Sequence, residues 1–145
     1  MKSLIILVVL LSTMVFSACG QKSDVPAKVI TAFTKKFPDA KKVSWDKENA
    51  SEWEAEFKMN GKEYSANFDT DGNWKETEFE IEKSEIPSSV KSTLDKDFNG
   101  YKIEEAEISE TANGKFYEFE LEKGKTDIDV AILPDGKLVK KEKKN

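Results

Sequence analysis

Carboxylates alternate with apolar side chains along two stretches of the chain, at the spacing of one face of a β-strand. Glu52, Glu54 and Glu56 form the first series, and Glu118 and Glu120 belong to the second. Neighbours in such a series lie about 7 Å apart, and paired carboxylates can perform acid–base chemistry on glycosides when a pocket raises the pKa of one of them. The alternation is also that of a solvated strand face, and we interpret it so. We therefore predict a protein that is not an enzyme, with a carboxylate-dependent enzyme as an alternative.

Other residues that could support catalysis or metal binding are few. The chain has no histidine and a single cysteine, Cys19, so no His-activated nucleophile and no His/Cys metal site can be built. The segment Asp69-Thr70-Asp71-Gly72 resembles the opening of a calcium loop, which needs several converging oxygen ligands. No bidentate glutamate follows at the required spacing, and a tight hairpin turn explains the segment. We predict no metal site and no cofactor.

The start of the chain has the parts of a bacterial export signal. Lys2 precedes an apolar run, Leu4 to Leu11, and the next charged residue is Lys22. A basic residue, an apolar run and small residues predict a signal peptide, and the run is short for a membrane span, which needs about 20 residues. Residues Phe16 to Cys19 resemble a lipobox, so we predict lipidation of Cys19. An ordinary cleaved signal with a stray cysteine is the alternative.

These features predict how the chain is divided into segments. Residues 1–18 are expected to form a lipoprotein-type signal peptide, 19–24 a polar tether, 25–142 one domain and 143–145 a tail. A segment of this length is sufficient for one domain with its own core. The predicted location is the bacterial cell envelope, periplasmic or surface-exposed, with the membrane reached through lipidated Cys19.

The charge of the chain argues against nucleic-acid binding. Its net charge is −5 and it contains no arginine, whereas phosphate contacts need clustered positive charge. The basic cluster from Lys137 to Lys144 is interpreted as a solvated chain end.

Residues 25–82 and 86–142 carry the same order of patterns. Val25-Pro26 opens the first segment and Ile86-Pro87 opens the second. In each, apolar residues at helical spacing precede alternating strand patterns and turn signals, and this order predicts a duplicated unit. The expected fold class is α+β: a tandem duplicated unit of one helix plus three to four antiparallel strands, with the helices packed on one face of the sheet. The opposite, solvated face would carry Glu52, Glu54, Glu56, Glu118, Glu120, Glu122, Asp127 and Asp129.

Aromatic residues divide into two groups by their phase in the strand patterns. Trp45 and Trp53 fall on the apolar face, where core packing is expected. Trp74 and Phe116 are out of phase with the apolar residues around them, which makes them candidates for exposed contacts. The candidate binding surface therefore comprises Trp74, Phe116, Glu118, Glu120, Asp127 and Asp129.

Several motifs occur together: Val25-Pro26, Ile86-Pro87, Phe37-Pro38, Trp45-Asp46, Asn60-Gly61-Lys62 and Asp71-Gly72-Asn73-Trp74. With them the chain resembles the PepSY-like, β-lactamase-inhibitor-like family of exported bacterial proteins over nearly all of residues 25–142. The resemblance implies a periplasmic or surface-exposed protein with helices packed on antiparallel sheets. It also implies, more loosely, the binding or inhibition of an enzyme.

The leading functional hypothesis is a non-catalytic envelope lipoprotein that acts as a protein- or ligand-binding module. Its partner would be an unidentified envelope protein or ligand. An inhibitor of an envelope hydrolase and a structural envelope lipoprotein are the further alternatives.

Overall fold

The computed structural model describes residues 24–144, so the predicted signal peptide, Cys19 and most of the predicted tether lie outside the described residues. The elements follow in the order α1 (Ala27–Lys36), β1 (Lys41–Asn49), β2 (Glu52–Met59), β3 (Lys62–Asp69), β4 (Trp74–Glu80), η1 (Lys83–Glu85), α2 (Ser88–Asp97), β5 (Lys102–Thr111), β6 (Gly114–Lys123), β7 (Thr126–Ile132) and β8 (Leu138–Lys143). Within residues 24–144, neither helix combines the length and the apolarity that a membrane span requires.

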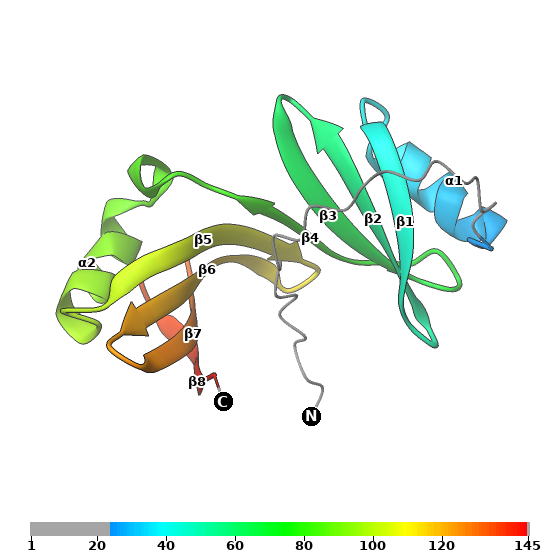
Figure 1. The fold of residues 1–145 in the computed structure, drawn as a ribbon. Helices are drawn as coiled ribbons and strands as arrows, with labels where there is room; N and C mark the ends of the chain where they lie inside the picture. Colours follow the sequence, from blue (N-terminus) through cyan, green and yellow to red (C-terminus); the bar gives the residue numbers. More distant parts are fainter. Residues whose placement is uncertain (1–23, 145) are drawn as a thin grey trace, which may run out of the picture.

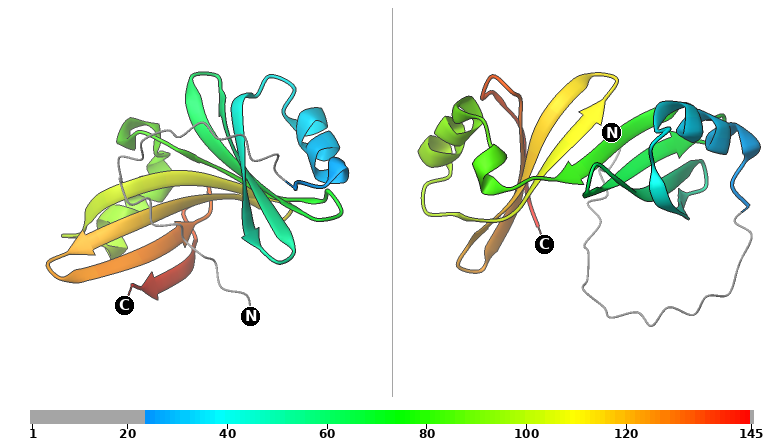
Figure 2. Two further views of the ribbon diagram at one scale, coloured as in Figure 1. Left: turned by 45° about the vertical axis from the view of Figure 1, so that its right-hand side comes forward. Right: turned by 90° about the horizontal axis from the view of Figure 1, so that it is seen from above.

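The eight strands of the described residues form one antiparallel sheet, in which each strand pairs with the next in sequence (Figure 1). The pairing continues through the middle of the chain, because β4 and β5 are joined from Glu76 opposite Thr111 to Glu80 opposite Glu107. The strands β1 and β8 are therefore the two edges of the sheet. The helices α1 and α2 lie at opposite ends of this twisted sheet (Figure 2).

The predicted fold class, a tandem α+β unit of one helix plus three to four strands with helices packed on a sheet face, is wrong. Residues 24–144 form mostly a single eight-stranded antiparallel sheet, and the two α-helices in this part of the chain have only 10 residues each. The reason lies between the halves of the chain, where the hydrogen bonds between β4 and β5 continue the ladder without a break. Sequence periodicity identifies strands, but it does not say which strands become neighbours.

The first half of the sheet packs on an aromatic cluster. The ring centroid of Phe33 on α1 lies 5.1 Å from that of Phe57 on β2 and 5.2 Å from that of Trp45 on β1. The Phe37 ring lies 4.7 Å from Phe57. Trp53 is buried in the same cluster, and the partly buried Trp45 packs against it, so both tryptophans lie on the core side of the sheet as predicted.

The second half packs on a mainly aliphatic cluster. Val90 and Leu94 of α2 are buried, and the strands contribute Ile108, Tyr117, Phe119, Leu121, Ile128, Val130 and Ile132. The Tyr64 and Phe79 rings, 4.8 Å apart between centroids, bridge β3 and β4. Apolar side chains thus occupy one face along the sheet, and the alternating residues point to the other.

Two glycine turns bring the sheet close to the helices. Gly72, after β3, has φ +85°, and a Cβ there would lie 2.7 Å from the Lys28 carbonyl oxygen of α1. Gly136, after β7, has φ +90°, and its Cβ would lie 2.7 Å from the Ser89 carbonyl oxygen of α2. Any side chain at these positions would both strain the backbone and collide with a helix.

Candidate functional site: an acidic sheet face

The sheet face that points away from the apolar clusters is acidic and hollowed. The hollow has a volume of about 1600 Å³, and it is lined by eighteen carboxylate residues and five lysines. We call this surface the acidic face. Its carboxylates are Glu48, Glu52, Glu54, Glu56, Glu63, Glu76, Glu78, Glu80, Glu82, Glu85, Glu104, Glu105, Glu107, Glu118, Glu120, Glu122, Asp127 and Asp129.

The register of the strands explains why the carboxylates gather. Glu80 of β4 lies opposite Glu107 of β5, and Glu107 lies opposite Glu118 of β6. A parallel row runs across β5, β6 and β7 through Glu105, Glu120 and Asp129. Residues that are directly opposite one another share a face, so each row places like charges side by side.

Glu78 of β4 lies near the centre of the acidic face, opposite Ser65 of β3 and Ser109 of β5. Burial, followed by the charges of the surrounding carboxylates, raises the pKa of Glu78 from 4.5 to about 8. Burial, followed by neighbouring carboxylates, also raises the pKa values of Glu54 and Glu107 to about 7. These three groups therefore exchange protons near neutral pH.

The face interpreted from the sequence as solvated is only partly so, because Glu56 is exposed whereas Glu54 and Glu118 are partly buried. Burial is also the main reason why the pKa values of Glu105, Glu118 and Asp129 are raised. A twisted antiparallel sheet is curved, and in this sheet the acidic face encloses a hollow in which carboxylates lose part of their hydration. Alternation along a strand shows which side chains share a face, but it carries no information about the curvature of that face.

One edge of the acidic face carries its own cations. Lys144 Nζ lies 2.6 Å from Glu120 Oε2 and 3.6 Å from Asp129 Oδ1. Lys140 of β8 also lines the hollow, and its charge acts to lower the pKa of Glu118. Most of the basic cluster, interpreted from the sequence as a solvated chain end, forms the edge strand β8 and pairs with β7, and Lys137, Lys141 and Lys143 are exposed.

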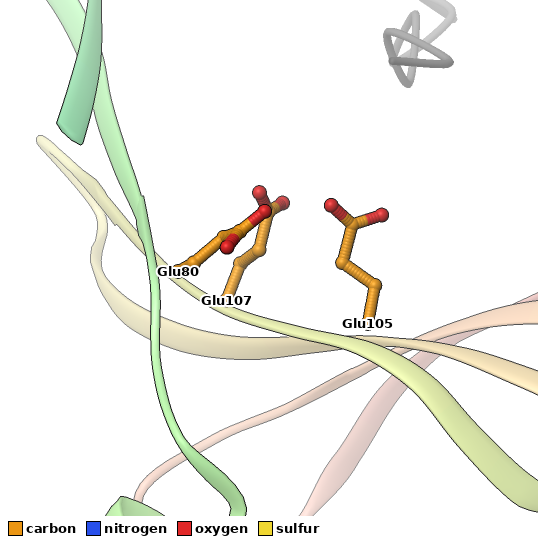
Figure 3. A group of neighbouring side chains, drawn as sticks. All are labelled: Glu80, Glu105 and Glu107. Carbon is orange, nitrogen blue, oxygen red and sulfur yellow. The ribbon is translucent and has the colours of Figure 1, made fainter. Parts of the chain in front are cut away.

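Three carboxylates converge where β4 meets β5. Among residues 24–144, oxygens of Glu80, Glu105 and Glu107 all lie within 4.8 Å of one another. Figure 3 shows the three side chains projecting to the same side of the sheet. Three carboxylates are fewer than the six to eight oxygen ligands that calcium takes, whereas the ammonium group of a lysine has three N–H donors to satisfy.

The aspartate-rich segment after β3 forms the predicted turn. The Asp69 carboxylate accepts hydrogen bonds from the backbone N–H of Asp71 at 3.0 Å and of Asn73 at 2.9 Å, and from Asn73 Nδ2 at 2.9 Å. The hydrogen bonds from Asn73 are the main reason why the pKa of Asp69 is lowered. The carboxylate oxygens are thus engaged in holding the turn.

Comparison with known families decides the classification. The family model described as "Putative beta-lactamase-inhibitor-like, PepSY-like" matches residues 51–140. The chain belongs to this PepSY-like family. The family resemblance predicted from the sequence is confirmed, and the matched segment runs from the start of β2 into β8.

Solved structures show the same fold. A BLIP-like protein from Bacteroides fragilis is 21% identical, with a TM-score of 0.74 over 81% of this chain and 86% of that chain. A DUF2874 family protein from Bacteroides uniformis is 21% identical, with a TM-score of 0.75 over 81% and 88%. A third protein, from Bacteroides eggerthii and described as "putative periplasmic", is 18% identical, with a TM-score of 0.74 over 82% of this chain and 88% of that chain. Comparison with curated protein sequences finds no match.

In this PepSY-like protein, five of the six residues of the candidate binding surface lie on one side of the sheet. Glu118, Glu120, Asp127 and Asp129 line the hollow. Phe116 is half-buried and lies opposite Ser109, on the same side of β6 as Glu118.

Trp74, the sixth residue, lies apart from the acidic face. A register shift after Asn67 pairs Trp74 with Phe68, and such a bulge reverses the side to which the following residues point. Trp74 Nε1 donates a hydrogen bond to Thr77 Oγ1 at 2.9 Å, and Lys36 Nζ lies 3.7 Å from the centroid of the indole ring. The indole of Trp74 is therefore engaged by residues of the same protein, Thr77 and Lys36.

Sequence reasoning missed the carboxylates at the centre of the acidic face. They lie on β4 and β5 and are Glu76, Glu78, Glu80, Glu105 and Glu107. Their signal was present, because Glu76, Glu78 and Glu80 alternate with Thr77 and Phe79. The out-of-phase Trp74 obscured that alternation, and nothing in the sequence indicated that β4 pairs with β5.

Proposed function

We propose that this protein is a non-catalytic binding module of the bacterial cell envelope, and that a positively charged protein partner docks on the acidic face. The observation that carries the proposal is the composition of the hollow, with eighteen carboxylate residues against five lysines. A concave surface of one charge attracts a partner of the opposite charge and accelerates association. The inhibitor-like descriptions within the family support binding over catalysis.

Partial burial makes the acidic face a strong site for cations. A lysine or arginine side chain placed among Glu78, Glu107 and Glu118 would replace repulsion between carboxylates with attraction. Attraction between charges is stronger where hydration is reduced than on an open surface. Lys144 gives an internal example, because its ammonium group contacts both Glu120 and Asp129.

The start of the chain and a structural relative support the proposed cellular setting. The sequence predicts an export signal and acylation of Cys19, and a structural relative is described as "putative periplasmic". We include membrane attachment through lipidated Cys19 in the proposal. Inhibition of an envelope hydrolase would be a narrower use of the same face, and the family description favours it as a second candidate.

Binding to a fluorescent decalysine peptide tests the docking face. Measured at low salt and about pH 8.5, the affinity of the protein should fall at least tenfold when Glu78, Glu107 and Glu118 are all replaced by Gln, and it should weaken as salt screens the charges. The control replaces Asp39, Asp95 and Asp97 by Asn, because these exposed residues do not line the hollow.

The two triple variants lose the same number of carboxylate groups. A difference between their affinities for decalysine therefore reports the location of the removed charges and not the net charge of the protein. Equal affinities for both would contradict the proposal. Weak binding by the Gln variant should not result from loss of folding, because removing charges that repel one another in a partly buried site should stabilise the fold. Far-UV circular dichroism checks that both variants are folded.

A further inference from the structure

Glu54, Glu78 and Glu107 sit on the acidic face without a cation of their own. Among residues 24–144, none of the eleven ion pairs involves any of these three carboxylates. Two lysines that line the hollow are already engaged at its rim, Lys58 with Glu63 and Lys62 with Glu85. Lys144 is engaged with carboxylates of β6 and β7.

Carboxylates face these three groups from several strands of the sheet. Those that act on Glu78 come from its own strand β4 and from β2, β5 and β6: Glu76, Glu54, Glu107 and Glu118. Those that act on Glu107 come from β4, β5 and β6: Glu105, Glu118, Glu80 and Glu76. Those that act on Glu54 come from β1 and β2, Glu48, Glu56 and Asp46, and the Ser65 hydroxyl of β3 opposes them through a hydrogen bond.

We propose that protons and a basic partner compete for Glu54, Glu78 and Glu107, so that docking on the acidic face releases protons. This inference rests on the proposed function and adds its regulation: the face is neutralised by protons when free and by ammonium or guanidinium groups when occupied. The exchange is balanced in charge, because each carboxylic acid that loses its proton to the solvent becomes a carboxylate paired with a partner cation.

The chemistry of the groups supports the exchange at physiological pH. Burial and like charges raise the pKa of Glu78 to about 8 and those of Glu54 and Glu107 to about 7. A nearby cation favours the ionised form and lowers these values. At about pH 7.5 the three carboxyl groups of the free protein therefore carry, in total, roughly one proton that they lose when the complex forms. The affinity for a cationic partner then rises with pH across the neutral range.

Calorimetry with decalysine measures the exchange directly. Lysine side chains stay protonated up to about pH 10, so the probe does not titrate in the range used. Titrations at about pH 7.5 in two buffers of different ionisation enthalpy should show release of roughly one proton, and the Kd should rise about tenfold or more between about pH 8.5 and pH 6.5. Glu78→Gln should roughly halve the proton release and weaken the dependence of Kd on pH.

Glu63→Gln is the matched control, because Glu63 lines the same hollow but is paired with Lys58, which lowers its pKa. It removes the same charge and should leave proton release unchanged.

Binding of decalysine without proton release, or a Kd that does not change with pH, would overturn this inference and leave the proposed function standing. Failure of decalysine to bind at about pH 8.5, where the three carboxylates are mostly ionised, would overturn the proposed function as well. A 13C NMR titration of the free protein, with the Glu78 carboxyl carbon titrating at its ordinary value, would also overturn the inference.

Discussion

Glu80 of β4 and Glu107 of β5 stand directly opposite one another in the strand pair that joins the two halves of the sheet. With Glu105 they bring carboxylate oxygens within 4.8 Å of one another. Like charges placed opposite one another destabilise a sheet, so the pairing that makes the sheet continuous also concentrates repulsion at its centre. Local features that cost stability without an evident structural gain are expected at functional sites, and this relationship supports the acidic face as the site of binding.

The free energy of unfolding should decrease as the pH rises from about 5 to about 8.5. Glu54, Glu78 and Glu107 have higher pKa values in the folded protein than the ordinary 4.5. The folded state therefore binds more protons than the unfolded state in this interval, and stability present below about pH 4.5 is lost as the pH passes through 7 to 8. Urea unfolding at several pH values measures the slope, and a stability that increases across this interval would contradict the account.

Replacing Glu78 by Gln should remove part of that pH dependence. At about pH 8.5 the variant should be more stable than the wild type by roughly 1–3 kcal/mol, because the buried charge is gone. At about pH 4, below the ordinary pKa of 4.5, the two proteins should be about equally stable, because Glu78 is then mostly protonated in the folded and the unfolded state and Gln resembles the neutral acid. Glu63→Gln serves as the control and should change stability by less than about 1 kcal/mol, as expected for an exposed ion pair.

Phe57 and Phe116 should differ in their contribution to stability. Phe57 is 2% exposed and packs against Phe33 and Phe37, so Phe57→Ala should cost about 3–5 kcal/mol. Phe116 is half-buried on the side of the acidic face, and Phe116→Ala should cost clearly less. Urea midpoints for the two variants measure the difference, and equal losses would show that the assignment of these side chains to opposite faces is wrong.

Alanine substitutions at Gly72 and Gly61 should distinguish the cost of backbone strain from the cost of a steric collision. Both have positive φ, +85° and +80°, but a Cβ meets the Lys28 carbonyl oxygen at 2.7 Å only at Gly72 and finds open space at Gly61. Gly61→Ala should therefore cost only the strain, about 1–2 kcal/mol. Gly72→Ala should cost more, because α1 and the turn must also move apart. Thermal unfolding of both variants tests this, and equal losses would mean that the turn does not fix the position of α1.

The predicted lipidation of Cys19 can be tested in the native host. Several acyl chains on one residue anchor a protein stably, where a single chain is marginal. Cys19→Ala should release the protein from membranes or leave it as unprocessed precursor, as judged by fractionation and apparent size. A membrane-bound form of mature size in this variant would refute the lipoprotein assignment.

The strands and turns could be predicted from the sequence because their signals are local. The alternation of Glu52 to Lys58 identifies β2, and Asn60-Gly61, with φ of 52° and 80°, forms the turn that follows it. The pairing of β4 with β5 could not be predicted, because it depends on which backbone groups meet in three dimensions. Because of that pairing, the expected fold class is wrong, and the central carboxylates of β4 and β5 lie side by side.

The candidate site was predicted in part for the same reason. Glu118, Glu120, Asp127 and Asp129 share a face by simple alternation, and the structure places all four on the hollow. Trp74 was misplaced because a bulge changes the alternation at the start of β4. The raised pKa values of Glu54, Glu78 and Glu107 depend on the curvature of the sheet, which no pattern of residues along one strand encodes.

The most direct test of the docking face is a 15N NMR titration of the protein with decalysine at low salt and about pH 8.5, where the carboxylates of the acidic face are mostly ionised. The account predicts that chemical-shift changes concentrate on the strands that carry the acidic face, with the largest around Glu78, Glu107 and Glu118, and that α1 and α2 change little. Shift changes centred on the helices, or spread evenly over exposed acidic residues such as Asp39 and Asp95, would contradict it.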